Sequence, residues 1–352
     1  MASEVSGPAW RFLKKRKRVD TKDIFQVYRN SDTVNAGGAP VTINFMVAGD
    51  DKYFYLLREN CAHVKARYPE ARVIVFDFGL TPGQVASFGA AWPNVEVVDW
   101  TAQVDDLSQV RETTPPEQRR KLAIAVNARR TGLAKKIRKF MLKRFPGSAT
   151  SRRAEDRALW FENLLIQKIQ CMKHASTLCA GEPLVFLDAD AILFEPIDEV
   201  FAEGADVTVT LLDDKHNWDR DQCSVLNSGV IFFGPKTEAR EAFLDAWWAE
   251  TLATREWLRE QTALVRFIHR QAPTLFTPNR SETVALNGID VNVRMVPCSV
   301  YNFNDMGGRE PETFPHAKIY HFADRRQEKR RFFPLLSTLK ARAEKMAKEK
   351  PA

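Results

Sequence analysis

Long uninterrupted hydrophobic runs are missing from this sequence of 352 residues. No segment reaches the roughly 18 to 20 apolar residues that a membrane-spanning helix needs. The first residues, MASEVSGPAWRFLKKRKR, also lack the apolar core that a secretory signal requires. We therefore expect a cytoplasmic protein, with peripheral contact at the inner face of a membrane as the alternative to a fully soluble one.

Cysteine is scarce and its spacing carries no motif. The five cysteines are an odd number, and they form neither a CxxC pair nor a zinc-type pattern; they are Cys61, Cys171, Cys179, Cys223 and Cys298. This excludes a disulfide framework and predicts reduced thiols in the core. An internal repeat and a recognised nucleic-acid motif are also missing, so no nucleic-acid partner is expected.

Apolar and basic residues are abundant by comparison. The chain is 44% hydrophobic and 28% charged, which is enough apolar mass for a large globular core. Its 52 Lys and Arg against 45 Asp and Glu leave a net charge of +7. This balance favours anionic partners, and phosphate ligands, acidic lipid headgroups and nucleic acid all satisfy it.

Short β-branched and aromatic runs alternate with segments of helical spacing from Val41 onward. VTINFMVAGDD, ARVIVFDFGL and NVEVVDW are the first such runs, and DVTVTLLDD, VLNSGVIFFGP and AKIYHF follow later. This alternation predicts an α/β fold with a mainly parallel sheet and helices on both faces. We expect a basic leader over residues 1–40, a catalytic domain over 41–330 and an amphipathic, lysine-rich tail over 331–352. A helix over 159–178 and a long tryptophan-containing helix over 238–270 are also predicted.

A basic helical insertion interrupts this pattern between Pro115 and Pro146. Leu122, Val126 and Leu133 recur at near-helical spacing among many Arg and Lys. Two interpretations stay open: a surface helix pair that packs on the domain, which is slightly favoured, or an element that lies on an anionic membrane.

Acidic residues follow three of the predicted strands. Asp50 and Asp51, then Asp77, then Asp188 and Asp190 each come directly after an apolar run. Because the carboxyl ends of parallel strands form the ligand crevice of an α/β sheet, these acids should share one rim. Asp188 and Asp190 lie two apart, so on an extended strand they would point the same way. Such a pair suits Mg²⁺ or Mn²⁺, which also bind diphosphate oxygens.

The motifs VFLDADAIL and LNSGVIFF, preceded by FMVAGDDKYF and VIVFDFGL and followed by KIYHF, resemble those of GT-A fold glycosyltransferases, in particular glycosyltransferase family 8. The motifs that carry the resemblance follow the family's order along the chain from about Val41 to Phe322. It implies a GT-A fold with a mixed, mainly parallel sheet flanked by helices. It also implies a metal-dependent transfer of sugar from a nucleoside diphosphate sugar to a glycan, lipid-linked or protein acceptor, and it favours retention at the anomeric carbon.

The resemblance assigns roles position by position. Asp188 and Asp190 correspond to the metal-binding acids on either side of Ala189, and His321 corresponds to the third ligand. The positions expected to contact the nucleotide, the diphosphate or the sugar are Ala48, Asp50, Asp51, Tyr53, Lys168, Ser228 and Gly229, with Asp77 on the same rim. Catalytic roles are expected for Asn227, for Asp213 or Asp214, and for Glu282.

Two segments depart from the family pattern. Glu282 and Asn287 resemble the ends of a family segment with the pattern DQ..LN, but Thr283 replaces the glutamine. After His321 the usual glycine and lysine are missing, so Arg325, or else Arg326 or Lys329, would supply positive charge to the diphosphate.

Two other classes of protein remain as alternatives. A haloacid-dehalogenase-type phosphohydrolase also has an apolar strand that ends in Asp-x-Asp, and it would use Asp188 as its nucleophile. A basic protein that binds a membrane or nucleic acid without catalysis is the second alternative. The glycosyltransferase hypothesis makes a geometric demand that the others do not: Asp188, Asp190 and His321 must meet within the reach of one metal ion.

Overall fold

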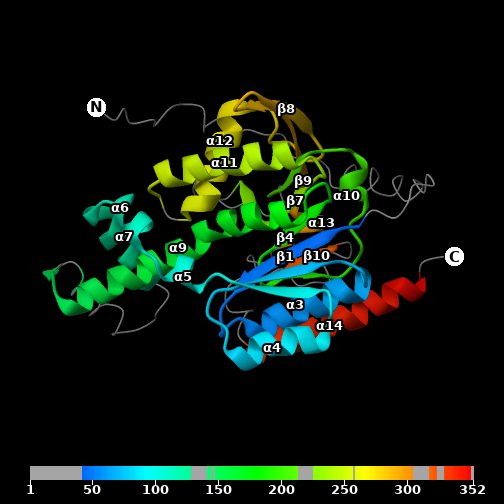
Figure 1. Cartoon of the computed structure of the whole chain (residues 1–352), viewed down its shortest axis with the longest axis horizontal. Helices are drawn as coiled ribbons and strands as arrows, with labels where there is room; N and C mark the ends of the chain where they lie inside the picture. The colour runs from blue at the N-terminus through cyan, green and yellow to red at the C-terminus, as the bar shows by residue number, and fades with distance from the viewer. Residues whose placement is uncertain are drawn as a thin grey trace.

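The computed structural model of the chain describes residues 42–127, 140, 142, 144, 145, 147–212, 225–256, 258–303, 317–322 and 329–349. Strands and helices alternate through most of this range (Figure 1). Its strands are β1 Asn44–Gly49, β2 Val73–Asp77, β3 Val95–Asp99, β4 Leu184–Leu187, β5 Ala191–Leu193, β6 Val207–Leu211, β7 Leu226–Phe233, β8 Ser281–Leu286, β9 Ile289–Pro297 and β10 Ile319–His321.

The helices differ widely in length. The longer ones are α3 Phe54–Arg67, α4 Pro82–Ala91, α7 Pro116–Asn127, α9 Ala149–Leu178, α11 Thr237–Ala253, α12 Arg259–Gln271 and α14 Lys329–Glu349. The short ones are α5 Thr101–Asp105, α6 Ser108–Glu112, α10 Glu199–Ala202 and α13 Cys298–Tyr301. No helix in the described ranges combines the length and the apolar character that a bilayer crossing requires.

Eight strands form the main sheet in the order β3-β2-β1-β4-β7-β6-β9-β8. Six of them run in the same direction, whereas β7 and β8 are antiparallel to their neighbours. A separate antiparallel pair joins β5 to β10. The predicted α/β class with a mixed, mainly parallel sheet is thus confirmed, and this is the architecture that the GT-A resemblance implies.

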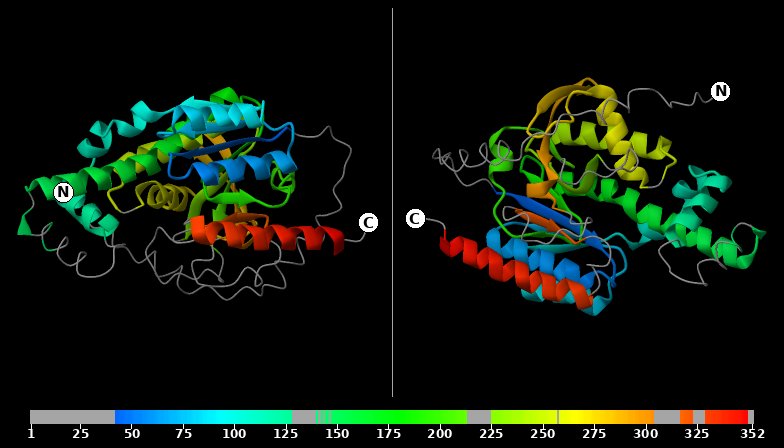
Figure 2. Two further views of the ribbon diagram at one scale, coloured as in Figure 1. Left: turned by 90° about the horizontal axis from the view of Figure 1, so that it is seen from below. Right: turned by 180° about the vertical axis from the view of Figure 1, so that it is seen from behind.

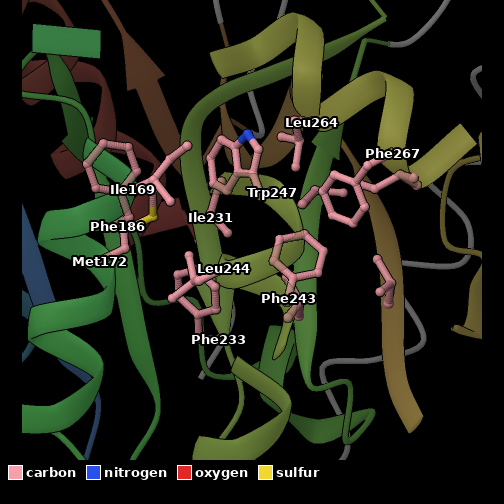
Figure 3. Packing of buried hydrophobic residues seen from close by; sticks show 14 of the residues in the cluster. Ile169, Met172, Phe186, Ile231, Phe233, Phe243, Leu244, Trp247, Leu264 and Phe267 are labelled. Atoms are coloured by element: carbon pink, nitrogen blue, oxygen red, sulfur yellow. The ribbon is translucent and has the colours of Figure 1, made fainter. Parts of the chain in front are cut away.

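Helices cover both faces of the sheet, as Figures 1 and 2 show. On one face α3 and α4 bury Leu57, Cys61 and Phe88 against the first strands. On the other face α9, α11 and α12 pack on the sheet around a larger core, whose Phe243, Trp247 and other aromatic rings appear in Figure 3. Burial of such rings excludes water from the largest area per residue and stabilises the fold accordingly.

Several predicted elements are confirmed and others need correction. The helix predicted over 159–178 begins earlier, at Ala149, because the Ser148 side chain accepts a hydrogen bond from the Ser151 backbone N–H and caps it. The helix predicted over 238–270 is two helices, α11 and α12, which are separated at Leu258 by a left-handed backbone conformation with φ of 51°. The four cysteines in the described range, Cys61, Cys171, Cys179 and Cys298, are buried as expected.

Two polar side chains of α3 hold the segment that follows β4. The amide of the buried Asn60 donates to the carbonyl oxygens of Asp188 and Ala191, at 3.3 and 2.8 Å. One turn later, Nδ1 of His63 donates to the carbonyl oxygen of Leu193 at 2.8 Å. Since these carbonyls belong to β5 and the turn before it, α3 fixes the position of the Asp188–Asp190 turn.

A pH dependence of stability follows from His63. Burial lowers the pKa of this imidazole to about 4, because the charged form would lose its hydration. Between pH 6.5, near the usual histidine pKa, and pH 4 the unfolded chain binds a proton that the folded chain does not, so stability falls as the pH falls. This contribution should reach about 3 kcal/mol over the whole window.

Replacement of His63 by Asn tests this, since Asn keeps an N–H donor and does not titrate. The free energy of unfolding in urea should fall less between pH 7 and pH 5 for His63→Asn than for the wild type. Parallel curves for the two proteins over this range would show that His63 titrates normally in the folded state.

Candidate functional site

The Asp188–Asp190 segment is a turn at the carboxyl end of β4. Asp188 N–H donates to the Gly229 carbonyl at 2.7 Å, and Ala191 N–H donates back to the Asp188 carbonyl at 2.8 Å. The prediction that the two aspartates lie on an extended strand is therefore wrong, because they lie in a turn. The turn nevertheless brings both carboxylates to one place, and Ala189 packs away from them against apolar residues.

His321 reaches this turn from far along the chain. Strand β10 pairs with β5 so that His321 lies opposite Ala191, and Phe322 N–H donates to the Asp190 carbonyl at 2.8 Å. The His321 Nε2 atom lies 3.2 Å from Asp190 Oδ1 and 4.0 Å from Asp188 Oδ2. One ligating atom from each of the three side chains falls within 4.8 Å of the others. The geometric demand derived from the sequence is met.

Asn302 sets the orientation of the His321 ring. Its Oδ1 accepts a hydrogen bond from Nδ1 of His321 at 2.8 Å, which turns Nε2 towards the two aspartates. Asn302 is itself held, because its amide donates to Thr210 Oγ1 at 2.9 Å. Burial disfavours a charged imidazole, but Asp190 and Asp188 outweigh this effect and raise the pKa of His321.

A buried lysine forms an ion pair with Asp188. Lys168, on α9, places Nζ 3.3 Å from Asp188 Oδ1 and 2.8 Å from Glu260 Oε1. Only 6% of Lys168 is exposed. Burial favours the neutral amine, yet Asp188 and Glu260 more than compensate and raise the pKa of Lys168, so this lysine stays charged. Lys168 therefore lies beside the aspartate turn, while its predicted contact with the diphosphate or the sugar stays a prediction. Glu260 is a partner that the sequence did not predict.

The first turn of α12 lies against the N-terminal end of β7. Ser228 donates its hydroxyl to Glu260 Oε1 at 2.7 Å, and its backbone N–H donates to Gln261 Oε1 at 3.1 Å. Asn227 Oδ1 accepts from the Gly229 N–H at 2.9 Å. The predicted Asn-Ser-Gly segment thus lies between the aspartate turn and an acid–amide pair on α12.

Buried polar groups fix the start of α12. The Arg259 guanidinium donates to the hydroxyls of Thr113 and Thr114, at 2.9 and 2.5 Å. Glu162, fully buried on α9, is attracted to the same guanidinium, and burial raises the pKa of this carboxyl to about 7. Because Arg259 directly precedes Glu260, these contacts determine where the acid–amide pair points.

The other strand ends lie on the same edge of the sheet. Extension of the β1–β4 register by two residues places Ala48 beside Asp188. Asp50 Oδ1 accepts from the backbone N–H groups of Lys52 and Tyr53, and Asp77 Oδ1 accepts from those of Gly79 and Leu80. These two carboxylates close local turns, while Asp51 and Tyr53 are exposed on the same rim.

Two predicted site residues lie away from the aspartate turn. Glu282 lies on β8, which is separated from β4 by four steps across the sheet, or roughly 19 Å at the usual strand spacing. There it pairs with Arg280 at 2.7 Å. Asn287 has a φ of 52° and precedes Gly288 in the tight turn between β8 and β9. An Asn-Gly pair is the preferred sequence for such a hairpin, so these residues serve the fold.

Four further predicted residues fall outside the described residues: Asp213, Asp214, Arg325 and Arg326. Lys329 is described, and its Nζ lies over the ring of Tyr55 at 5.1 Å from the ring centre.

Sequence reasoning missed Glu260, Gln261 and Asn302. A signal for the first two was present, because Glu260-Gln261 matches the acid–glutamine order of the family segment better than Glu282-Thr283 does. The prediction of one long helix over this range concealed it, since the acid–amide pair then seemed to lie in mid-helix. No pattern in the sequence pointed to Asn302.

Asp188, Asp190 and His321 are placed so that they could hold one metal ion. Two carboxylates and an imidazole form a ligand set that suits Mn²⁺ or Mg²⁺ better than softer metals. The hydrogen bond from Nδ1 of His321 to an amide oxygen is the usual support for a histidine ligand. Gly229 leaves the space that this arrangement needs, because a Cβ atom there would collide with His321 and lie 2.8 Å from Asp188 Oδ2.

Comparison with solved structures returns glycosyltransferases. The galactosyltransferase LgtC, solved with donor and acceptor sugar analogues, is 12% identical with a TM-score of 0.41, over 84% of this chain and 95% of LgtC. The bifunctional glycosyltransferase WbbM is 12% identical with a TM-score of 0.41, over 86% of this chain and 53% of WbbM. GlyE of Streptococcus pneumoniae TIGR4 is 10% identical with a TM-score of 0.42, over 81% and 55% of the two chains.

No known protein family and no curated protein matches the chain. Because the three TM-scores lie below 0.5, the functional interpretation depends on the residues of the site.

Replacement of Gly229 by Ala should displace the His321 ring. The added methyl group has no room between His321 and Asp188, so the free energy of unfolding should fall by about 1 to 3 kcal/mol. Gly234→Ala is the matched control, since a Cβ atom there collides with the Ala205 carbonyl at the other end of β7. Both variants should lose stability in urea, but only Gly229→Ala should shift the NMR signals of the His321 ring. Unchanged His321 signals in Gly229→Ala would contradict the geometry described.

Proposed function

We propose that the chain is a metal-dependent glycosyltransferase. It would move a sugar from a nucleoside diphosphate sugar to a glycan, lipid-linked or protein acceptor. The observation that carries the proposal is the convergence of Asp188, Asp190 and His321, from two distant segments, at the carboxyl edge of a mixed α/β sheet. This edge is where open α/β sheets bind their ligands.

The charges around the site fit a divalent cation. Counted by formal charge, Asp188, Asp190 and Glu260 contribute −3 and Lys168 contributes +1, a balance of −2 with a neutral His321. Burial raises the pKa of Asp188, which opposes its negative charge and favours a cation beside it. A divalent cation on Asp188, Asp190 and His321 would cancel this balance. Although its burial acts in the opposite direction, the pKa of His321 is also raised by the two aspartates. Cation and proton therefore compete, and cation affinity should fall as the pH falls.

A bound cation would neutralise the negative charge that develops on the diphosphate as the anomeric C–O bond breaks. The chain's own contribution is positioning. Lys168 forms an ion pair with Asp188, and Glu260 forms a second ion pair with Lys168. The Asp188 carboxylate therefore keeps one orientation. The exposed rim residues Asp51 and Tyr53, with Ala48, lie where the nucleoside part would bind.

We assign the sugar side of the site to Gln261 and Asn227 in place of Glu282. Gln261 is on the first turn of α12 and contacts Ser228, which lies next to Gly229 and the aspartate turn. An amide at this position is a group that could face the sugar ring from one side, in agreement with the retention that the family resemblance favours.

Manganese and a nucleoside diphosphate together should stabilise the wild type. At a ligand concentration of 100 times Kd, binding to the folded state adds about 2.7 kcal/mol, which is a rise of several degrees in Tm. The double variant Asp188→Ala/Asp190→Ala should lose this rise, whereas Asp290→Asn, an exposed aspartate on β9, should keep it. An equal rise in wild type and double variant would contradict the proposal. Metal-dependent hydrolysis of an aryl phosphate, lost in Asp188→Asn, would instead support the phosphohydrolase alternative.

The role of α12 is tested by the rate at which nucleoside diphosphate sugars are hydrolysed. Gln261→Ala should lower kcat by about 10- to 100-fold, because a misplaced reacting sugar costs rate more than affinity. Glu282→Ala should leave kcat and KM unchanged, since β8 is remote from Asp188. The reverse pattern would restore Glu282 as the catalytic residue.

A further inference from the structure

The first half of α9 and the helix α7 extend beyond the main sheet as an arm. Figure 1 and both views of Figure 2 show them reaching away from the strands. We define the arm as α7, the described residues from 140 to 148, and α9 as far as Leu159. It has its own small core, to which Leu122, Leu142 and Ala154 contribute. The arm is therefore a packed extension with surfaces of its own.

Two phenylalanines are exposed on the arm. Phe140 is 60% exposed and Phe145 is 49% exposed, more than the other exposed large apolar side chains in the described range. Their ring centres are 6.4 Å apart, edge to face. Leu142, which lies between them in the sequence, is buried in the arm's core, so the two rings form an apolar patch on the outside. Water contact with such a patch is unfavourable unless a partner covers it.

Basic side chains are exposed on the same arm. Arg144, Arg152, Arg153 and Arg157 are exposed on the arm. Of the nearby acids, Asp156 is engaged with Arg111 at 2.9 Å. In the sequence, residues 115–146 hold eleven Lys and Arg against one acidic residue, a net charge of +10 compared with +7 for the whole chain. Along the sequence, the rest of the protein is thus slightly acidic, and the excess of positive charge comes from this segment.

We propose that the arm docks on the surface of an anionic lipid bilayer, with Phe140 and Phe145 inserted among the headgroups. Rings next to basic residues fit this occupant, because the headgroup region accepts aromatic rings while acidic lipids attract the arginines. Nucleic acid would satisfy the charges, but the two rings lie together at one place and do not line a groove along which successive bases could stack.

The arm and the candidate metal site lie at different parts of one helix. From Ala149 to Lys168, α9 spans about 29 Å at 1.5 Å per residue. Changes at Phe140 or Phe145 therefore leave the contacts of Lys168 and Asp188 intact. The inference does not depend on the proposed function, and its failure would leave that function untouched.

Co-sedimentation of the full-length protein with vesicles tests the proposal. The protein should bind vesicles of phosphatidylcholine with phosphatidylglycerol and not those of phosphatidylcholine alone. Binding should weaken between about 0.1 M and 1 M salt, where the Debye length falls from about 10 to 3 Å. Phe140→Ser and Phe145→Ser should each weaken binding about tenfold. Phe333→Ser, which changes a ring that is 43% exposed on α14, is the matched control and should bind as the wild type does.

A second pair of variants tests the charges. Arg153→Gln/Arg157→Gln should weaken binding to the same vesicles about fivefold per charge, with unchanged far-UV circular dichroism. Equal binding to neutral vesicles would overturn the proposal, and so would loss of binding in Phe333→Ser alone. Tighter binding to single-stranded DNA than to anionic vesicles would assign the arm to a nucleic acid instead. A dimer that Phe140→Ser abolishes, without vesicle binding in the wild type, would assign it to a second copy of the chain.

Discussion

The structure around the site depends on the compensation of buried negative charge. Asp188, Asp190 and Glu260 lie close together where helices and strands largely exclude water, and an unpaired carboxylate there would cost several kcal/mol. Lys168 satisfies two of them and His321 lies against the third. Each partner comes from a different element, so the relative positions of α9, α12, β4 and β10 are linked. A shift of any one of them would leave a charge without its partner.

The same compensation connects the fold to the proposed chemistry. In the proposed function, a divalent cation would offset the negative charge of the site and a diphosphate would bind beside that cation. Against the effect of burial, Asp190 and Asp188 raise the pKa of His321. Asn302 holds the ring so that Nε2 faces these two carboxylates, the orientation that a metal ligand needs.

Sequence reasoning succeeded where a local pattern and a physical rule coincide. Apolar runs that end in acids predicted β1, β2 and β4 and the shared edge at their carboxyl ends, because parallel strands leave no other arrangement. It placed Glu282 and Asn287 at the site, whereas the structure puts them on the β8–β9 hairpin, where an Asn-Gly pair is the preferred turn sequence. It missed the pair Glu260-Gln261 because the break at Leu258, a leucine in a left-handed conformation, has no recognisable signature.

The sequence by itself determined the class of the fold, the acids on one rim and the concentration of positive charge between residues 115 and 146. These properties depend on residue type and near neighbours along the chain. Only the tertiary structure decided that Glu260 holds Lys168, that Asn302 orients His321, and that Phe140 and Phe145 stay outside. The first two contacts join residues 92 and 19 positions apart, and the third depends on which side of a helix is covered, so no spacing along the chain records them.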